Sequence, residues 1–345
     1  MKGLVCEAVG KISLQDVRKP HIMAPTDALI RITLTTICGS DVHLVRGHIP
    51  TEPGFIMGHE FVGRVEEVGI AVSRFKPGDR VVGPASPFCG TCDNCRAGQI
   101  QRCLNGGMLG SGRAWGDLSG THSEYILMPF ADRTLVSVPA SLKDEQVLFV
   151  GDILSTGYYG VCKAGLCPGE SVVVLGAGPV GLCAVHAATL FGPRSIIAVD
   201  LIDHRLQLAR EMGATHVVDA TKGDVVQQIL EHTNGGPEVV IEAAGAPAAI
   251  QQAVDMVRIG GRIMVVGLPT RHVEFSLPAM IMKNVSLFTG LAYLGNMERL
   301  VRLIEAGKLD TTPLISHRMR LSEIEHGFKM FAAQQNNVVK IAVTP

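Results

Sequence analysis

Four cysteines lie within fifteen residues of the chain, and their spacing is its strongest chemical signal. Cys89, Cys92, Cys95 and Cys103 are separated by three, three and eight residues. Steps of three let a tight turn aim successive sulfurs at one point, and the longer step completes a tetrahedron. A closed shell of four thiolates is the ligand set of structural zinc, with no position left for water. We expect a structural-zinc lobe over about residues 86–106, which by itself implies no catalysis.

Two further candidate metal ligands are separated along the chain. Cys38 follows the strand-like run 31–37, and His59 and Glu60 stand in the segment 58–60, which is expected to open a strand that runs on through residues 61–63. A thiolate and a neutral imidazole together suit zinc. A lone cysteine at a strand end more often packs than ligates. Because both residues occur in a chain with a four-cysteine lobe, a second zinc site is the better interpretation.

A glycine-rich turn connects a β-branched run to a helical stretch. The run 172–175 is suited to a strand buried on both faces, and a helix is expected from Val180 to about Leu190. Between them stands the G-x-G-x-x-G pattern that lets a dinucleotide pyrophosphate lie against a helix N-terminus. We assign to this cofactor-binding turn Gly176, Gly178, Pro179, Val180 and Gly181.

The next predicted strand, 195–200, ends in an acidic residue. Asp200 follows Gly178 by 22 residues, and an acid at this point accepts hydrogen bonds from the ribose 2′-hydroxyl and repels a 2′-phosphate. The pattern therefore favours NAD over NADP. The alternative is that Asp200 only caps the helix that begins near Asp203. Arg205 is a candidate neighbour of the adenosine or a solvated side chain.

Strands and helices continue to alternate after this point. Helices are expected over 204–212 and 248–257, and strands over 216–218, 238–241 and 262–267. Such alternation predicts a parallel, doubly wound α/β sheet, and its ligands bind beyond the carboxyl ends of the strands. The residues expected to line the nicotinamide side are Ala243, Ala244, Val266, Gly267 and Leu268.

The first 150 residues have a different pattern, in which short β-rich runs alternate with Gly/Pro turns such as 75–80. This pattern predicts a mostly β, barrel-like domain, and the length of 345 residues also suggests two domains. A net charge of −1 without a basic run argues against nucleic acid as a partner. The uncharged segment 171–192 is interrupted by four glycines and a proline, which argues against a membrane span.

The cellular compartment is predicted from the cysteines and the N-terminus. The first residues lack the apolar core of a signal peptide. Nine cysteines, four of them in a metal cluster, fit a reducing compartment better than a disulfide framework. We therefore expect a cytoplasmic protein.

These motifs resemble the zinc-dependent alcohol dehydrogenases of the medium-chain dehydrogenase/reductase superfamily, and the resemblance extends over the whole chain. The segment Cys38-Gly39-Ser40-Asp41-Val42-His43 matches the family's C-G-S-D-x-H. The family's zinc signature stands at Gly58, His59, Glu60, Gly63, Gly69 and Val72. The resemblance implies a GroES-like β catalytic domain, a Rossmann cofactor domain, NAD, and two zinc ions per chain.

The resemblance also implies roles for individual residues. A catalytic zinc would be held by Cys38, His59 and Asp152; Asp152 stands where many members have a second cysteine, and carboxylate is an accepted zinc ligand. Its alternative role is to cap the helix that follows. Glu60 resembles the residue that enters the coordination sphere during ligand exchange. Ser40 would take the hydroxyl proton and His43 would release it to solvent, while Thr156 would contact the nicotinamide.

The residue patterns and the family resemblance together predict the domain limits. Residues 1–152 are expected to form the catalytic domain, 153–290 the cofactor domain, and 291–345 the segment that completes the catalytic domain. The run 285–289 resembles an edge strand that pairs across a dimer, in a homodimer or homotetramer.

The expected reaction is reversible hydride transfer between NAD and a small or medium alcohol. The alternative substrates are polyols or amino alcohols, as in sorbitol and threonine dehydrogenases. A different class, a non-enzymatic zinc-containing nucleotide binder, would be expected to have lost a catalytic ligand. A zinc-free quinone reductase of the superfamily would lack both the cysteine lobe and the Cys/His pair.

Overall fold

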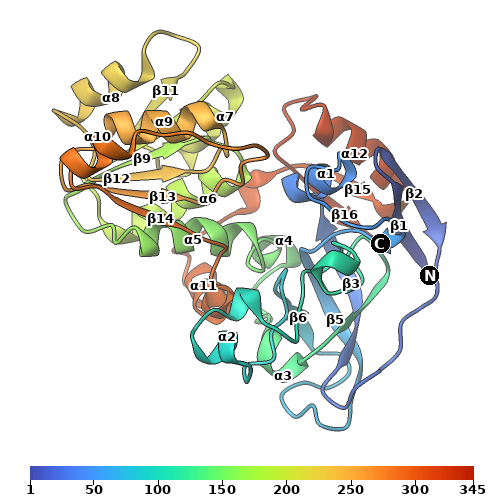
Figure 1. Cartoon of the computed structure of the whole chain (residues 1–345). Helices are drawn as coiled ribbons and strands as arrows, with labels where there is room; N and C mark the ends of the chain where they lie inside the picture. The colour runs from blue at the N-terminus through green and yellow to red at the C-terminus, as the bar shows by residue number, and fades with distance from the viewer. The chain divides into compact units, whose positions relative to one another are not determined.

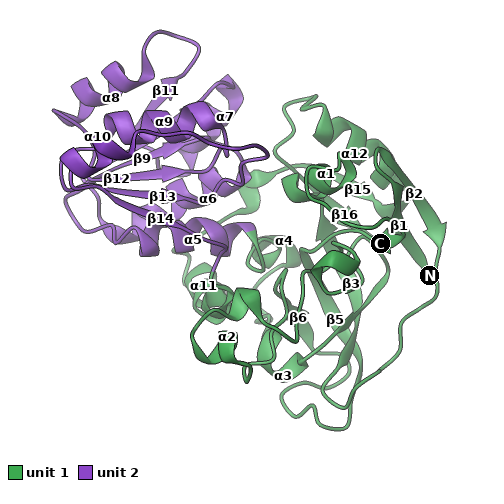
Figure 2. Cartoon of the chain, in the orientation of Figure 1, with its two compact units in different colours: residues 1–152, 293–345 green, residues 153–292 purple.

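The computed structural model describes all residues from 1 to 345, and the chain forms two compact units (Figures 1 and 2). Unit 1 contains residues 1–152 and 293–345, and unit 2 contains residues 153–292. The chain thus leaves unit 1 after residue 152 and returns to it after residue 292, so that the C-terminal segment belongs to the same unit as the N-terminus.

Unit 1 is built mainly from β-strands. A seven-stranded sheet has the order β15-β16-β3-β5-β6-β8, with β7 paired to β3, and a three-stranded sheet has the order β2-β1-β4. The strands are β1 (Lys2–Ala8), β2 (Lys11–Asp16), β3 (Ala28–Thr36), β4 (Phe55–Ile56), β5 (Phe61–Val68), β6 (Arg80–Val82), β7 (Tyr125–Met128), β8 (Val136–Ser137), β15 (Ile315–Arg320) and β16 (Lys340–Thr344). The expected mostly β, GroES-like architecture is confirmed.

Short helices lie between these strands. They are α1 (Gly39–Val45), α2 (Asp93–Arg96), α3 (Ala131–Thr134), α4 (Asp144–Val147), α11 (Met297–Glu305), α12 (Ile324–Ala332) and the 3₁₀ turns η1 (Ile100–Arg102), η2 (Arg113–Trp115), η4 (Leu294–Asn296), η5 (Thr312–Leu314) and η6 (Leu321–Glu323). Alternate residues of β3, such as Ile30 and Ile32, pack into one apolar core with Phe61 and Val81. A second core joins β1 and β16 to α12 through Leu4, Ile341 and Phe328, which fixes the C-terminal strand within the unit.

Unit 2 is a doubly wound α/β domain. All its strands are parallel, in the order β11-β10-β9-β12-β13-β14. The strands are β9 (Ser171–Leu175), β10 (Ser195–Asp200), β11 (His216–Asp219), β12 (Val239–Glu242), β13 (Arg262–Val265) and β14 (Ser286–Thr289). The helices are α5 (Ile153–Lys163), α6 (Pro179–Ala188), η3 (Thr189–Phe191), α7 (Asp203–Glu211), α8 (Val225–Thr233), α9 (Pro247–Met256) and α10 (Leu277–Met282). The predicted Rossmann-type sheet is confirmed.

The strand order reverses between β9 and β12, and the helices cover both faces of the sheet (Figure 1). Helices α5, α6 and α7 contact one another in sequence, and α9 contacts both α8 and α10. The latter group closes an apolar core over Val173, Ile229 and Val254. Val172, Val173 and Val174 have no exposed surface, as a parallel strand covered on both faces requires. No helix combines the length and apolar character needed to cross a membrane.

Candidate zinc and cofactor sites

One end of the β-rich unit brings together four residues that are distant in the sequence. The side-chain ligand atoms of Cys38, His59, Glu60 and Asp152 all lie within 4.8 Å of one another. Cys38 is the N-cap of α1, two residues after the end of β3. His59 lies just before β5, which begins at Phe61 and not at residue 58 as expected. Asp152 is the last residue of unit 1 before the chain enters unit 2. The ends of three segments of one unit thus converge on a single point.

The contacts among these four residues suit a cation. The Asp152 Oδ2 atom is 3.2 Å from His59 Nε2 and 3.7 Å from Cys38 Sγ. The His59 side chain has no exposed surface, whereas 23% of the Asp152 side chain is exposed. Burial alone would lower the pKa of His59, but the carboxylates of Asp41 and Asp152 outweigh it and raise this pKa well above its ordinary value. The cluster therefore stabilises positive charge.

The donor set fits zinc. It offers a thiolate, an imidazole nitrogen and a carboxylate oxygen, which are the three ligand types that zinc accepts in open, three-residue sites. A fourth candidate ligand atom, Glu60 Oε2, is buried without a hydrogen-bond partner. Cys38, His59 and Asp152 are the residues that would hold the metal, with Glu60 beside them.

Glu60 is tethered on its other side by a lysine that the sequence analysis did not single out. The Lys340 Nζ atom lies 2.5 Å from Glu60 Oε1 and 3.0 Å from the Ile37 carbonyl oxygen, and both charged side chains are fully buried. Burial would lower the pKa of Lys340, but Cys38, Glu60 and Asp152 raise it, so Lys340 stays charged. A single lysine within the apolar run 338–343 is the signal that could have revealed it.

The expected proton-transfer residues, Ser40 and His43, both lie on α1, and Thr156, the expected nicotinamide contact, lies on α5. The Ser40 Oγ atom is 3.2 Å from His59 Nε2, which places this hydroxyl at the cluster. His43 is in the last turn of α1, and its Nδ1 atom is 3.1 Å from His48 Nδ1. Partial burial and the neighbouring His48 and Arg46 lower the pKa of His43, so its imidazole is neutral at pH 7. Thr156 belongs to α5 of unit 2.

The four cysteines of the lobe also converge. Cys92 is the N-cap of α2, and Cys103 follows η1 directly. All four sulfurs lie within 4.8 Å of one another, with Cys89–Cys103 and Cys92–Cys103 separations of 3.5 and 3.8 Å. Sulfurs around a tetrahedral zinc are about 3.8 Å apart, whereas a disulfide needs about 2 Å, and all four cysteines are free. The arrangement fits a four-thiolate zinc site.

Backbone amides support the charge on these sulfurs. The N–H groups of Thr91 and Cys92 donate to Cys89 Sγ at 3.4 and 3.3 Å. Burial would raise the pKa of Cys89, but these bonds and those from the side chains of Thr91 and Asn105 outweigh it and lower the pKa to about 5. At neutral pH Cys89 is therefore a thiolate, the form that binds metal.

Replacing Cys103 with serine tests the lobe. Because a neutral hydroxyl replaces one of four thiolates, we expect Cys103→Ser to lose one zinc per chain and to lower the Tm by on the order of 5–10 °C. Metal analysis of the purified protein and thermal unfolding measure both effects. The control, Cys167→Ser, changes an exposed cysteine outside the lobe and should leave both values unchanged. Full zinc content in Cys103→Ser would contradict a four-thiolate site.

In unit 2 the glycine turn has the geometry that its sequence predicts. Gly176 follows β9 with φ of +91°, and a Cβ there would lie 2.9 Å from Ala244. A Cβ on Gly181 would lie 1.8 Å from the Gly176 carbonyl oxygen, so neither position tolerates a side chain. Gly178 is the N-cap of α6, and Pro179 occupies its first turn. The free amides at the N-terminus of a helix are the groups with which dinucleotide-binding turns hold a pyrophosphate.

Asp200 ends β10 and is tied to this turn. Its Oδ2 accepts the Ala177 N–H at 2.7 Å, and its Oδ1 accepts those of Leu201 and Ile202 at 2.8 and 3.0 Å. The N-cap of α7 is Ile202, so Asp200 is not the capping residue of that helix. Arg205 lies in the first half of α7, and its buried Nε has no hydrogen-bond partner.

The loop after β12 borders the point where the strand order reverses, and it lies against the loop after β13, where a Cβ on Gly245 would be 2.7 Å from the Leu268 oxygen. The two loops contain the predicted residues Ala243, Ala244, Val266, Gly267 and Leu268. A buried carboxylate that the sequence analysis did not single out, Glu242, joins them. Its Oε1 accepts the N–H groups of Ala244 and Gly245, both at 2.9 Å, and its backbone oxygen accepts that of Val266 at 2.8 Å.

Glu242 makes the stability of unit 2 depend on pH. Burial raises the pKa of Glu242 to about 7 although backbone amides oppose the shift. The folded state therefore binds more protons than the unfolded state between about pH 4.5 and 7, and stability falls as pH rises through this window. A shift of this size corresponds to roughly 3 kcal/mol, an order-of-magnitude value.

The variant Glu242→Gln separates this effect from other titrations. Its amide is neutral at every pH, and its oxygen still accepts the two N–H bonds. We expect a higher Tm than the wild type at pH 8 and an equal Tm at pH 5, measured by thermal unfolding across this range. Glu231→Gln, in an exposed position of α8, is the control. Parallel curves for Glu242→Gln and the wild type would contradict the prediction.

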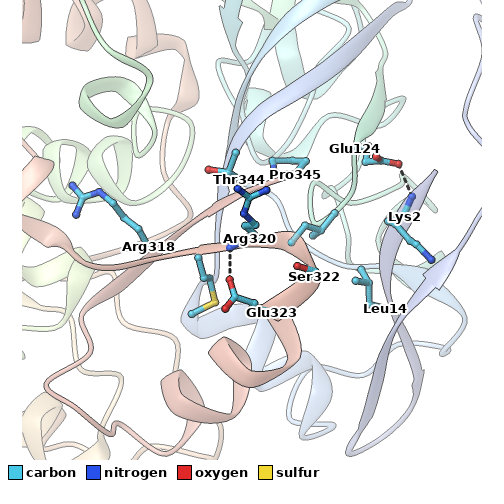
Figure 3. Close-up of a pocket in the computed structure, with 11 residues that line it drawn as sticks. Lys2, Leu14, Glu124, Arg318, Arg320, Ser322, Glu323, Thr344 and Pro345 are labelled. Atoms are coloured by element: carbon cyan, nitrogen blue, oxygen red, sulfur yellow. Dashed lines mark hydrogen bonds between the residues drawn. The ribbon is translucent and has the colours of Figure 1, made fainter.

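A surface pocket of about 640 Å³ lies elsewhere in unit 1. It is lined by residues of β1, β2, β15, β16 and η6, among them Lys2, Arg318 and Arg320 (Figure 3). Lys2 pairs with Asp16, and Arg318 pairs with Glu145 through two hydrogen bonds. Lys2 and Arg318 are thus engaged in surface ion pairs, and no residue of either metal-ligand cluster lines this pocket.

Comparison with known proteins identifies the family. Residues 24–140 match the alcohol dehydrogenase GroES-like domain, and residues 179–306 match the zinc-binding dehydrogenase family. An alcohol dehydrogenase of Cupriavidus necator is 37% identical, over 100% of this chain and 99% of that protein. The structure of the Thermus sp. ATN1 alcohol dehydrogenase TADH has a TM-score of 0.95 and 38% identity, over 100% of this chain and 99% of that one.

Other relatives have different names. A zinc-binding dehydrogenase of Sinorhizobium meliloti 1021, solved with NADP, has a TM-score of 0.91 and 31% identity, over 100% of this chain and 99% of that one. A sorbitol dehydrogenase of Bacillus subtilis and an L-threonine 3-dehydrogenase of Rhizobium etli are 31% and 32% identical.

The fold and the two metal-ligand clusters define a zinc-dependent oxidoreductase of the medium-chain dehydrogenase/reductase superfamily. Within it, this chain belongs to the zinc-type alcohol dehydrogenase family. It acts on CH–OH groups and uses a nicotinamide cofactor.

Proposed function

We propose that this enzyme transfers hydride reversibly between NAD and a small or medium primary or secondary alcohol, at a zinc held by Cys38, His59 and Asp152. The observation that carries the proposal is the convergence of the ligand atoms of these residues within 4.8 Å. A thiolate, an imidazole and a carboxylate leave a fourth position for substrate. The partial exposure of Asp152 beside buried Cys38 and His59 supports an accessible site.

The bound zinc supplies Lewis acidity, which lowers the pKa of an alcohol hydroxyl and polarises a carbonyl in the reverse direction. Ser40 is suited to accept the hydroxyl proton because its Oγ lies 3.2 Å from His59 Nε2. His43, whose pKa is lowered, is neutral at pH 7 and is suited to take the proton on to solvent. We assign Thr156 to a nicotinamide contact. Glu60, tethered by Lys340, is the reserve ligand during exchange.

NAD is the proposed cofactor. Gly176, Gly178, Pro179, Val180 and Gly181 would surround the pyrophosphate, and Ala243, Val266, Gly267 and Leu268 would line the nicotinamide side. Asp200 supports NAD because its negative charge would repel a 2′-phosphate. Arg205, with a free Nε, is the candidate contact to the adenosine. The NADP-bound relative from Sinorhizobium meliloti makes NADP the cofactor against which this proposal is tested.

Polyols and amino alcohols are the second candidate substrates. The identities to the sorbitol and threonine dehydrogenases favour keeping them in the assay. The test is NADH formation over a panel of simple alcohols, polyols and amino alcohols, with NAD and NADP in parallel and zinc measured in the same sample. Two zinc ions per chain with NAD-dependent turnover would support the proposal. One zinc per chain without turnover would leave a nucleotide-binding protein with a structural zinc.

We also propose that two chains pair through β14, in a homodimer or in a homotetramer. This strand is at the edge of its sheet, and α10 before it exposes Leu277, Ile281 and Met282. Such an edge with apolar neighbours favours pairing with a second copy.

We also propose a cytoplasmic location. The nine free cysteines support a reducing compartment.

If two chains pair through β14, lysines on the exposed face of α10 should reduce the size of the assembly. Ile281 and Met282 are 65% and 81% exposed, so lysines at both positions should not disturb the core of the unit. We expect the double variant Ile281→Lys/Met282→Lys to shift the mass in solution toward the monomer, measured by light scattering after gel filtration. Ile70→Lys, at a position 96% exposed in the other unit, is the control. An unchanged mass in the double variant would exclude this face.

A further inference from the structure

His122 is a fully buried histidine that is not among the proposed metal ligands. It lies in the segment that precedes β7, and its side chain has no exposed surface. Two backbone bonds hold the segment in place: the His122 N–H donates to the Met57 oxygen at 2.8 Å, and its own oxygen accepts the Leu4 N–H at 2.8 Å. The imidazole is therefore held in a fixed position beside the segment that leads to His59.

The absence of a side chain at position 58 leaves space for the His122 ring. Gly58, which directly precedes the proposed ligand His59, has φ of +95°, and a Cβ there would lie 2.5 Å from His122 Nδ1. Any side chain at position 58 would therefore displace the imidazole. The ring is in direct contact with the backbone that presents His59.

Both ring nitrogens of His122 have polar partners. Nε2 is 3.3 Å from Asp41 Oδ2, and Nδ1 is 3.3 Å from Thr35 Oγ1. An ionised carboxylate only accepts hydrogen bonds, so Nε2 carries the proton toward Asp41, whereas the hydroxyl of Thr35 can accept or donate. The tautomer that donates to Asp41 is thus compatible with every neighbour.

Asp41 in turn contacts the metal-ligand cluster. Its Oδ2 accepts the Cys38 N–H at 2.8 Å, and its Oδ1 lies 3.2 Å from His59 Nδ1. The second contact is within ion-pair distance, and neither of its two atoms has a hydrogen-bond partner. Interactions with Oδ2 therefore set the plane of the carboxylate and the direction in which Oδ1 faces His59. A carboxylate that faces one nitrogen of a ligand histidine fixes its tautomer and directs the other nitrogen to the metal.

We propose that His122 is a positioning residue for the catalytic zinc: by donating its Nε2–H to Asp41, it orients the carboxylate that aims His59. This inference rests on the proposed zinc site at Cys38, His59 and Asp152. It assigns to His122 no contact with substrate or metal. Its effect is on the affinity and geometry of the zinc site, through Asp41.

The test is zinc competition on the full-length holoenzyme against a chromogenic chelator. We expect His122→Ala to lower the zinc affinity of the site at Cys38, His59 and Asp152 by about 10–100-fold. The resulting partial loss of zinc should lower kcat and leave the KM for NAD unchanged. His122→Gln keeps an N–H donor for Asp41 and an oxygen for Thr35, so it should restore most of the affinity. Met57→Ala, which empties a fully buried position of the same unit, is the control for loss of packing alone.

Two results would overturn the proposal. The first is a zinc affinity in His122→Ala equal to that of the wild type. The second is an equal loss of zinc affinity in His122→Gln, His122→Ala and Met57→Ala, since lost packing would then explain the effect. If His122→Ala does not fold, a double-mutant cycle between His122→Phe, which fills the site without a donor for Asp41, and Asp41→Asn replaces it, and additive effects on zinc affinity would overturn the proposal. Failure of the zinc site itself is distinguishable, because the wild type would then hold only the zinc of the cysteine lobe.

Discussion

Asp152→Asn is expected to remove one of two zinc ions per chain and to lower kcat/KM for the alcohol by on the order of 1,000-fold or more. Asparagine has nearly the shape of aspartate but no negative charge, and it is a poor zinc ligand. In the structure, Asp152 Oδ2 stands 3.2 Å from His59 Nε2 and 3.7 Å from Cys38 Sγ. Removing its charge leaves one thiolate and one imidazole, too few for an open zinc site.

The same variant distinguishes the two roles considered for Asp152. Asparagine caps helices about as well as aspartate does, so a capping residue would tolerate the change without loss of zinc. Asp152→Cys should instead keep two zinc ions, because a thiolate also binds zinc. Metal analysis and steady-state kinetics of the two variants measure these outcomes. Asp16→Ala, at an exposed position of β2, is the control, and full zinc content in Asp152→Asn would exclude the ligand role.

Local sequence patterns were sufficient to predict the main strands and the glycine turn of the cofactor unit. The β-branched run 172–175, the glycine turn and Asp200 each have the place in the sheet that their spacing predicts, as β9, the start of α6 and the end of β10. Asp224 caps α8, and its side chain accepts the Gln227 N–H, as is typical of an aspartate that directly precedes a helix. These features depend on neighbours within a few residues, so the sequence alone contains the information.

The partners of residues that act over long sequence distances could not be found in this way, even where an apolar run, as around Lys340, indicates burial. Lys340 is 280 residues from Glu60, and His122 is 81 residues from Asp41. Their burial depends on the packing of several strands, which no local spacing reports. Glu242 is the last residue of a strand, a position where polar residues are common. Only its contacts with Ala244 and Gly245 show that it holds the loop after β12. The sequence predicted ligand types by motif, whereas the groups that orient them required the fold.

Asp200→Asn is expected to lower the preference for NAD over NADP by about 100-fold, expressed as the ratio of the two kcat/KM values. Loss of the carboxylate removes charge-assisted bonds to the ribose hydroxyls, each worth about 1.5–3 kcal/mol. It also removes the charge that repels a 2′-phosphate. The two effects have opposite signs for the two cofactors, so the ratio changes more than either value.

The ratio of kcat/KM for NAD to that for NADP also separates a role of Asp200 in cofactor recognition from a role in the local fold. Asp200 accepts the N–H groups of Ala177, Leu201 and Ile202, so its replacement disturbs the glycine turn that both cofactors would use. A disturbed turn alone would lower kcat/KM for NAD and NADP by the same factor and leave the ratio unchanged. Asp255→Asn, in an exposed position of α9, is the control for a lost surface charge. A ratio equal to that of the wild type in Asp200→Asn would therefore show that Asp200 shapes the turn without selecting the cofactor.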